Sequence, residues 1–320
     1  MRASARAQPN IALIKYWGKR DTTRNLPAVG SISITLADLH TTMSVGFDGS
    51  LAADSLVVNG VENESMLART TVCLDSVAGA DRDHAAITSE TNFPIAAGLA
   101  SSSSAFAALT VAADAAIGRN NSPEQLASIA GRSSGSAARS LMGGFVELQN
   151  TTHDIALTNL CACEDWPLEV VVAITASGPK AVGSTEAMEL SRKTSPFYDR
   201  WIEQQDADID EARSAIAGRD FSRLASVAEH NCLKMHSVMW GSRPPMVYWN
   251  STTLACMEAV RELQSAGAGV FFTIDAGPQL KAICAPGSSA NVRDTLAAVP
   301  GVEDILVSGL GEGAVQIDDD

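Results

Sequence analysis

Residues 92–118 read NFPIAAGLASSSSAFAALTVAADAAIG, a segment that joins a strand-like stretch to a helix through a glycine and four serines. Unpaired backbone amides point outward at such a helix start, and the helix dipole adds partial positive charge, so this geometry favours a bound phosphate. Gly98 lets the backbone come close to a ligand, and Ser101 to Ser104 add hydroxyl donors. No Gly-Lys-Ser/Thr follows, which excludes a Walker A loop. The serines could alternatively act only as helix caps.

A second glycine- and serine-rich stretch, GRSSGSAARSLMGG, covers residues 131–144. Its Ser134-Gly135-Ser136 run precedes Arg139 by one turn or less, which predicts a second helix start with amides that face a ligand. An arginine beside those amides can hold a carboxylate or a phosphate through two parallel hydrogen bonds. The alternative is an ordinary solvated helix arginine.

An early strand-like stretch, PNIALIKYWGKRD, covers residues 9–21. The alternation of a strand predicts one face that carries Ile11, Leu13, Lys15 and Trp17. Lys15 would then continue an apolar row, where a lysine needs a partner or a ligand unless it reaches solvent at the strand end. Tyr16 and Lys19 are available for further phosphate contacts.

The apolar stretch VFFTIDAGP at 270–278 ends with Asp275 at the edge of a predicted core. A carboxylate before Ala-Gly-Pro could simply initiate a turn. Beside a lysine, it would be placed to orient or deprotonate a hydroxyl group.

Strand-like and helix-like patterns mix along the whole chain without a repeat or a low-complexity linker, which predicts an α+β or α/β body. We expect strands at 9–17, 31–47, 143–148, 168–176, 268–276, 280–285 and 302–307. We expect helices at 101–117, 123–131, 184–205, 208–238, 251–265 and 289–298, the second of them opened by Ser122-Pro123. A soft boundary near residue 165 separates two halves.

The chain has 23 basic and 37 acidic residues, so its net charge of -14 argues against nucleic acid or an anionic membrane as a partner. If the ligands are anions, positive charge must be concentrated locally. The early residues lack the apolar run of a signal peptide, and no apolar stretch reaches the ~20 residues that cross a bilayer.

The six cysteines lack zinc-like spacing and are interpreted as reduced, mostly buried thiols, which predicts a cytoplasmic location. The five histidines lack metal-ligand spacing, and His230 and His236 are interpreted as structural.

In this order and spacing, the motifs resemble the diphosphomevalonate decarboxylase family of the GHMP kinase superfamily. The matching pieces are NIALIKYWGKRD (10–21), SISITL (31–36), NFPIAAGLASS (92–102), SGSAARSLMGG (134–144), SPFYDRW (195–201), Met235-His236 and FFTIDAGP (271–278). The GLASS loop alone indicates only the superfamily, whereas KYWGKRD combined with SGSAARS and DAGP is more specific.

The resemblance implies an α+β, two-lobed GHMP kinase-like fold with the active site in the cleft between the lobes. Residues 1–165 would form the N-terminal lobe with the ATP phosphate loop, and residues 166–320 the C-terminal lobe with the catalytic aspartate. The implied reaction uses ATP and Mg2+ to phosphorylate the tertiary 3-hydroxyl of mevalonate 5-diphosphate. Phosphate and CO2 then leave to give isopentenyl diphosphate. The family is commonly homodimeric.

The resemblance also implies residue roles. Asp275 matches the catalytic aspartate near the 3-hydroxyl, Arg139 the arginine at the substrate carboxylate, and Lys15 the lysine beside them. The implied substrate contacts are Tyr16, Lys19, Ser134, Gly135, Ser136, Arg139 and Ser184. The implied ATP phosphate loop consists of Gly98, Leu99, Ala100, Ser101, Ser102 and Ser103. No magnesium ligands are implied.

Several positions depart from the family pattern, among them Gly30, Gly183, Ala187 and Gln279. Residues 180–188 lie near the substrate phosphates in the family, where some members carry an arginine at the position of Thr185. Mevalonate 5-phosphate decarboxylation and mevalonate 3-phosphorylation therefore remain alternatives within the superfamily. A non-catalytic nucleotide-binding sensor is the alternative outside it.

Overall fold

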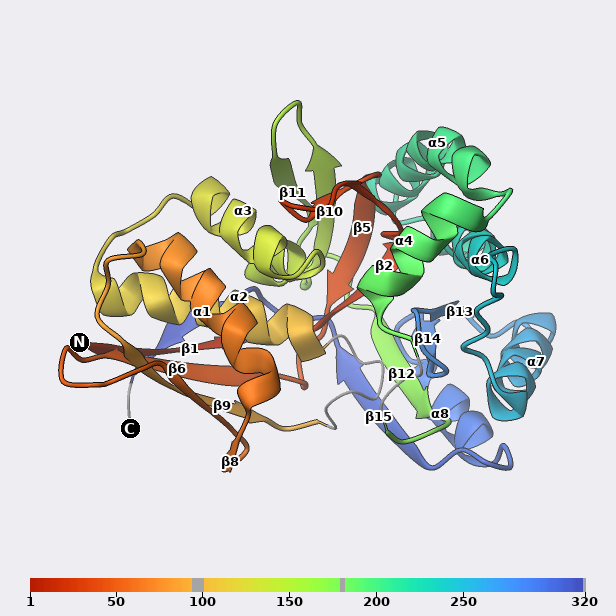
Figure 1. The fold of residues 1–320 in the computed structure, drawn as a ribbon. Helices are drawn as coiled ribbons and strands as arrows, with labels where there is room; N and C mark the ends of the chain where they lie inside the picture. The colour runs from red at the N-terminus through yellow and green to blue at the C-terminus, as the bar shows by residue number, and fades with distance from the viewer. Residues whose placement is uncertain (94–100, 179–181, 319–320) are drawn as a thin grey trace.

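The structure is a computed structural model that describes residues 1–93, 101–178 and 182–318. Within these residues, the strands form one six-stranded sheet, two four-stranded sheets and one two-stranded sheet. Figure 1 shows the first half of the chain on one side of the molecule, the second half on the other, and strands β2 and β5 between them.

The six-stranded sheet has the order β16-β1-β6-β9-β7-β8. Its strands are β1 (Arg2–Ala7), β6 (Thr41–Phe47), β7 (Ser55–Val58), β8 (Val61–Glu62), β9 (Ala85–Thr91) and β16 (Val315–Ile317). Helices α1 (Glu64–Ala78), α2 (Ser101–Ile117) and α3 (Pro123–Ser133) accompany it, and Figure 1 shows α1 and α2 on one face of this sheet. The alanine-rich α2 packs its small side chains closely against the sheet and ends at Gly118, whose φ of 68° favours glycine.

The middle sheet has the order β11-β10-β5-β2. Its strands are β2 (Asn10–Ile14), β5 (Ser31–Thr35), β10 (Phe145–Asn150) and β11 (Ile155–Cys161). The hairpin of β3 (Lys19–Asp21) and β4 (Leu26–Pro27) and the 3-10 helix η1 (Ala137–Leu141) complete this region.

The third sheet is antiparallel, with the order β13-β14-β12-β15. Its strands are β12 (Glu169–Ile174), β13 (Val270–Ile274), β14 (Leu280–Cys284) and β15 (Asp304–Gly309). The accompanying helices are α4 (Ser184–Thr194), α5 (Tyr198–Ala217), α6 (Phe221–Trp240), α7 (Ser251–Ser265) and α8 (Ser289–Ala297). One face of the sheet packs on α7 and α8, and the other contributes to a core that also contains Ile11 and Ile34 from the middle sheet.

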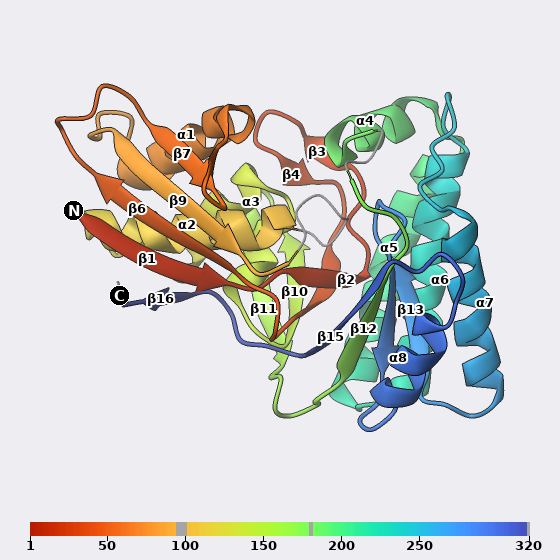
Figure 2. The same cartoon turned by 90° about the horizontal axis from the view of Figure 1, so that it is seen from below.

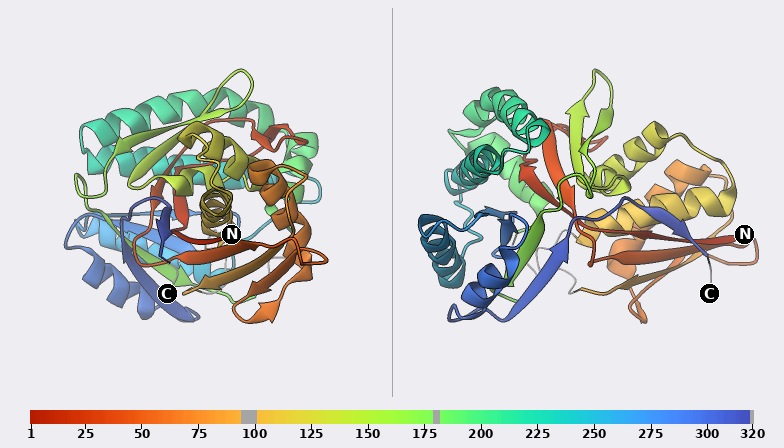
Figure 3. Two further views of the ribbon diagram at one scale, coloured as in Figure 1. Left: turned by 90° about the vertical axis from the view of Figure 1, so that its left-hand side faces the viewer. Right: turned by 180° about the vertical axis from the view of Figure 1, so that it is seen from behind.

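The division of the chain into two lobes between residues 165 and 166 remains a prediction. The last strand of the second half returns to the sheet of the first half. Strand β16 pairs antiparallel with β1, so Val315 lies opposite Arg6 in the six-stranded sheet. Figures 2 and 3 show this last strand beside the first one. The C-terminal residues therefore contribute to the sheet of the first half.

Several boundaries of the predicted elements were wrong. The expected helices 184–205 and 208–238 are three helices, because Pro196 follows the end of α4 and Gly218 ends α5 before Asp220 caps α6. The expected strand 31–47 is two strands, β5 and β6, which belong to different sheets. By contrast, the predicted start of α3 is confirmed, since Ser122 and Gln125 form a capping box next to Pro123.

A nearly buried ion pair links the segments that lead into β7 and β9 of the first sheet. Arg82 donates from Nη2 to Asp54 Oδ2 at 2.6 Å, and their side chains are 3% and 6% exposed. Burial alone would raise the pKa of Asp54, but hydrogen bonds from Arg82, Ala85 and Thr71 hold that pKa below its ordinary value.

Substituting Arg82→Met should therefore destabilise the fold by about 3–5 kcal/mol, because Asp54 would stay buried without its cation. Urea unfolding at pH 7 measures the loss. The pKa of Asp54 is lower in the folded protein than in the unfolded chain, so this stabilisation is fully present above about pH 4 and the difference should shrink as pH falls below that value. An undiminished difference at pH 3 would show that the ion pair is not its source.

Within the described ranges, no helix is both long enough and apolar enough to cross a membrane.

Candidate active site

A cavity of about 710 Å³ lies where the middle sheet meets the third sheet. The predicted site residues that line it are Lys15, Tyr16, Lys19, Ser102, Ser134, Gly135, Ser136, Arg139, Ser184 and Asp275. Its described lining also holds Arg69 and Arg132, which brings five cationic side chains together with one carboxylate, that of Asp275. The positive charge that the acidic chain needs for anionic ligands is thus concentrated here.

Lys15 reaches this cavity by a route that the alternation of the strand did not predict. The pairing of β2 with β5 shifts register between Ala12 and Ile14, so Leu13 and Ile14 both enter the core. Beyond this irregularity Lys15 lies on the cavity side, together with Asn10 and Ala12. The prediction that Lys15 shares a face with Ile11 and Leu13 was therefore wrong, because a β-bulge changes the face of every later residue.

Two helices of the second half hold the backbone of Lys15. Its N–H donates to Asn231 Oδ1 at 2.7 Å, and its carbonyl oxygen accepts from Gln205 Nε2 at 2.7 Å. Asn231 also donates to Gln205 Oε1 at 2.9 Å. These fully buried amides fix the strand end at which Lys15 turns toward the cavity.

Asp275 follows β13 and lies between two lysines. Lys15 Nζ is 2.6 Å from Asp275 Oδ1, and Lys281 Nζ is 3.2 Å from Oδ2. Burial by itself would raise the pKa of this carboxyl, but the two ammonium charges hold it well below its ordinary value. Asp275 is thus an ionised carboxylate at neutral pH, and its side chain is 27% exposed toward the cavity.

Arg139 is buried, and neutral oxygens hold its guanidinium in place. Nε and Nη2 donate to Asn10 Oδ1 at 3.3 and 3.1 Å, and Nη1 donates to Ser31 Oγ. Among the described residues, no carboxylate forms an ion pair with it. Burial lowers the pKa of Arg139 to about 10, against the opposing charge of Asp275. A fixed, charged guanidinium on a cavity wall is suited to a carboxylate or a phosphate.

The glycine–serine run before Arg139 leads into the short 3-10 helix η1, so the prediction of a second helix start was only partly right. Ser134, Gly135 and Ser136 all line the cavity. A Cβ on Gly135 would lie 2.6 Å from the hydroxyl of Tyr16, so only glycine fits beside this ring. The Tyr16 hydroxyl is buried without a partner among the described residues, and burial raises its pKa.

The start of α4 faces the same cavity from the second half. Gly183, Ser184 and Thr185 line it, and Lys19 Nζ donates to Thr185 Oγ1 at 3.1 Å. Burial, together with the charge of Arg69, lowers the pKa of Lys19. A helix N-terminus beside a lysine favours phosphate oxygens.

The predicted phosphate loop is described only in part, since Gly98, Leu99 and Ala100 lie outside the described residues. Ser101 begins α2, and Ser102 lines the cavity. Ser103 is fully buried, with its Oγ 3.5 Å from the backbone nitrogen of Asn10.

The sequence reasoning missed four residues of the site: Asn10, Arg69, Arg132 and Lys281. A signal exists for Lys281, because it is the one charged residue in the otherwise apolar strand LKAIC shortly after DAGP. Arg69 lies on α1, which had not been predicted as a helix, and it donates to the Ser133 carbonyl at 2.9 Å. Asn10 belongs to the motif NIALIKYWGKRD, but no pattern in the sequence indicates its contact with Arg139.

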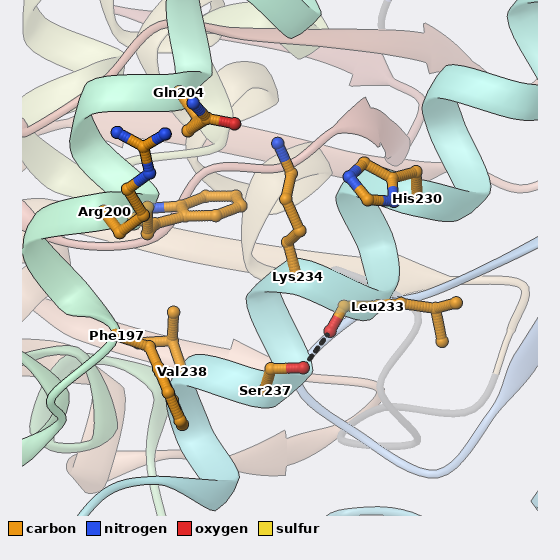
Figure 4. Close-up of a pocket in the computed structure, with 9 residues that line it drawn as sticks. Phe197, Arg200, Gln204, His230, Leu233, Lys234, Ser237 and Val238 are labelled. Atoms are coloured by element: carbon orange, nitrogen blue, oxygen red, sulfur yellow. Dashed lines mark hydrogen bonds between the residues drawn. The ribbon is translucent and has the colours of Figure 1, made fainter.

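A smaller cavity of about 310 Å³ lies between α5 and α6 and is shown in Figure 4. Its lining residues are Phe197, Arg200, Trp201, Gln204, His230, Leu233, Lys234, Ser237 and Val238. The cations there already have acidic partners, since Arg200 pairs with Glu203 and Lys234 with Asp208. This cavity holds none of the predicted site residues.

His236 is buried beneath the strand that ends at Asp275. Its Nε2 lies 3.2 Å from the Ile274 carbonyl and 3.2 Å from the Trp249 indole nitrogen. Burial lowers its pKa to about 3, so the imidazole is neutral at pH 7. This packing agrees with the structural interpretation of His236.

Each half of the chain matches a family of known proteins. Residues 7–158 match the model of a diphosphomevalonate decarboxylase-like N-terminal domain, and residues 170–303 match that of a mevalonate 5-diphosphate decarboxylase C-terminal domain. The chain is 33% identical to the diphosphomevalonate decarboxylase of Schizosaccharomyces pombe, over 92% of this chain and 81% of that protein.

The chain belongs to the diphosphomevalonate decarboxylase family. The resemblance drawn from the motifs is thereby confirmed.

Solved structures of the diphosphomevalonate decarboxylase family confirm the expected α+β, two-lobed fold. Mevalonate diphosphate decarboxylase from Staphylococcus aureus is 35% identical, with a TM-score of 0.93 over 99% of this chain and 98% of that one. A structure of MDDEF in complex with MVAPP, AMPPCP and magnesium is 31% identical, with a TM-score of 0.92 over 100% of this chain and 99% of that one.

Proposed function

We propose that this chain catalyses the ATP-dependent decarboxylation of mevalonate 5-diphosphate to isopentenyl diphosphate, releasing ADP, phosphate and CO2. The observation that carries the proposal is the convergence of Asp275, Lys15 and Arg139 on one cationic cavity. The family membership and the similarity to a protein held with MVAPP, AMPPCP and magnesium support the substrate and the use of ATP and Mg2+.

The cavity is suited to a substrate with an anion at each end. Arg139 presents a fixed guanidinium for the carboxylate. Lys19, Arg69 and the start of α4 provide cationic and amide donors for the diphosphate. Asp275 lines the same cavity, and the tertiary hydroxyl would be held beside it.

Asp275 is proposed as the residue that orients and deprotonates the 3-hydroxyl for attack on the γ-phosphorus of ATP. The carboxylate is available for this role because two lysines keep it ionised. Lys15 lies beside it and can stabilise negative charge on the transferred phosphoryl group.

Decarboxylation then follows from what the first step creates. Phosphorylation turns the tertiary hydroxyl into a good leaving group. When phosphate departs, the electron pair of the C–C bond to the carboxylate forms the new double bond, and CO2 is released. Arg139 holds the carboxylate in line with the breaking bond, which is a contribution of positioning.

The residues present fit ATP. Ser101 at the start of α2 and the hydroxyl of Ser102 on the cavity wall lie where amide and hydroxyl donors can meet phosphate oxygens. Among the described residues, no group of three His, Cys, Asp or Glu side chains could hold a metal ion. The phosphates of ATP would hold a magnesium ion, which would neutralise part of their charge.

We further propose a cytoplasmic homodimer. The six unpaired cysteines support a reducing compartment, and the family resemblance supports the dimer.

The substrate assignment is tested by kcat/KM with mevalonate, its 5-phosphate and its 5-diphosphate, each with ATP and Mg2+. We expect the diphosphate to give the highest value. A higher value for the 5-phosphate would make the chain a monophosphate decarboxylase, an outcome connected with Thr185 at the start of α4. ATP binding without turnover of any of the three would instead favour the nucleotide-binding sensor.

A further inference from the structure

We infer that Lys281 is a positioning residue that holds Asp275 in its reactive orientation and leaves Lys15 free to turn toward the substrate. The inference rests on the proposed catalytic role of Asp275. Lys281 is a second lysine beside Asp275, and its role differs from that of Lys15.

The two lysines contact different oxygens of the same carboxylate. Lys15 Nζ lies 2.6 Å from Oδ1, whereas Lys281 Nζ lies 3.2 Å from Oδ2. A carboxylate held at both oxygens cannot rotate about its terminal bond without losing one contact. Each oxygen still has a second lone pair, so the group can also accept the substrate hydroxyl.

Only one of the two lysines can reach a ligand. Lys15 lines the cavity, but Lys281 does not and is fully buried. Lys281 lies on β14 in the same face as Ile283, opposite Thr273 on β13 and Val172 on β12. A lysine enclosed in this way contributes through Asp275 and not through the substrate.

The two lysines also differ in the part of the fold that carries them. Lys281 lies on β14, and Asp275 directly follows β13, which pairs with β14 along its whole length. Lys15 comes from the end of β2 in the middle sheet. If substrate binding draws Lys15 toward a phosphoryl group, Asp275 therefore keeps its contact with Lys281, which is part of the same sheet.

Charge explains why a buried lysine is useful here. Burial lowers the pKa of Lys281, and Lys15 adds to this effect, while Asp275 opposes it. In return, Lys281 helps to hold the pKa of Asp275 down after Lys15 has turned away. Without Lys281, the pKa of Asp275 would rise, and the carboxylate would take up a proton at higher pH.

The test compares the pH dependence of kcat in wild type and Lys281→Met, with mevalonate 5-diphosphate and ATP. We expect kcat at pH 7 to fall about 10–100-fold with KM changed less than about 3-fold, because Lys281 does not touch the substrate. The acid limb of the profile should move to higher pH, because removal of a nearby cation disfavours the ionised carboxylate. Lys281→Arg keeps the charge and should restore the position of the acid limb.

Ile283→Val is the matched control. It perturbs the same strand and the same face, so it should lower stability without moving the acid limb. If Lys281→Met does not fold, Lys281→Gln removes the charge while keeping a hydrogen-bond donor and gives the same comparison. If the wild type is active and the neutral variant has its acid limb at the same pH as the wild type, the positioning role of Lys281 is overturned.

Unfolding experiments separate this inference from the proposed function. Lys281→Met should destabilise the wild type more than it destabilises Asp275→Asn, since only the first still carries the charge that Lys281 balances. Equal losses in the two backgrounds would overturn the inference even if the enzyme is active. Inactivity of the wild type toward the diphosphate would refute the proposed function, whatever the unfolding data show.

Discussion

Asp275→Asn is expected to lower kcat by about 10³-fold or more, while ATP still binds. The asparagine keeps the size of the side chain but cannot accept the hydroxyl proton, and the loss of a positioned general base typically costs up to about 10⁴-fold. ATP binding should persist because the start of α2 is formed by a different part of the chain. Steady-state kinetics and titration with ATP measure the two effects separately.

Glu147→Gln is the control for this variant. Glu147 is a buried carboxylate that pairs with Arg213 at 2.8 Å, and it does not line the cavity. The control should lose stability but retain kcat. Asp275→Asn with more than about a tenth of wild-type kcat would remove Asp275 from the proposed role.

Arg139→Met is expected to lower kcat/KM by about 10²–10³-fold. A carboxylate bound in a buried site would lose its charged partner, and truncation of such a pair typically costs about 2–5 kcal/mol. The variant also leaves Asn10 Oδ1 and Ser31 Oγ without their donor, so part of the loss appears as instability. Arg139→Lys keeps the charge but not the planar guanidinium, so its kcat/KM should lie between those of the wild type and Arg139→Met.

Arg82→Met provides the comparison, since it removes another arginine with a nearly buried side chain, in the segment before β9 and away from the cavity. It should be less stable and yet keep the wild-type kcat/KM at 25 °C. If Arg139→Met lost no more activity than this control, the proposed contact with the substrate carboxylate would be wrong.

Features of the fold and of the site are predictable from the sequence where neighbouring residues determine them. The Ser122-Pro123 start of α3 needs only the backbone around it, and it appears as expected. Asp275 was recognisable as a carboxylate that ends an apolar strand, because the strand and the turn after it are both local features. In each case the deciding residues are close in sequence.

Other features depend on partners far along the chain. The irregularity after Ala12 is defined by pairing with β5, so alternation within β2 alone assigned Lys15 to the wrong face. The hydrogen bonds from Asn231 and Gln205 to the backbone of Lys15 bridge about 200 residues, and no local pattern indicates them. Lys281 is an exception, since its place in an apolar strand is a local feature of the sequence.

The most direct test of the proposed reaction is the stoichiometry of a single turnover. Enzyme in excess is mixed with ATP, Mg2+ and mevalonate 5-diphosphate labelled in its carboxyl group, and ADP, phosphate and released CO2 are measured together. The proposal predicts equal amounts of all three, with isopentenyl diphosphate as the organic product. ADP formed without CO2 would identify a kinase, and CO2 formed without ADP would contradict activation of the 3-hydroxyl by phosphorylation.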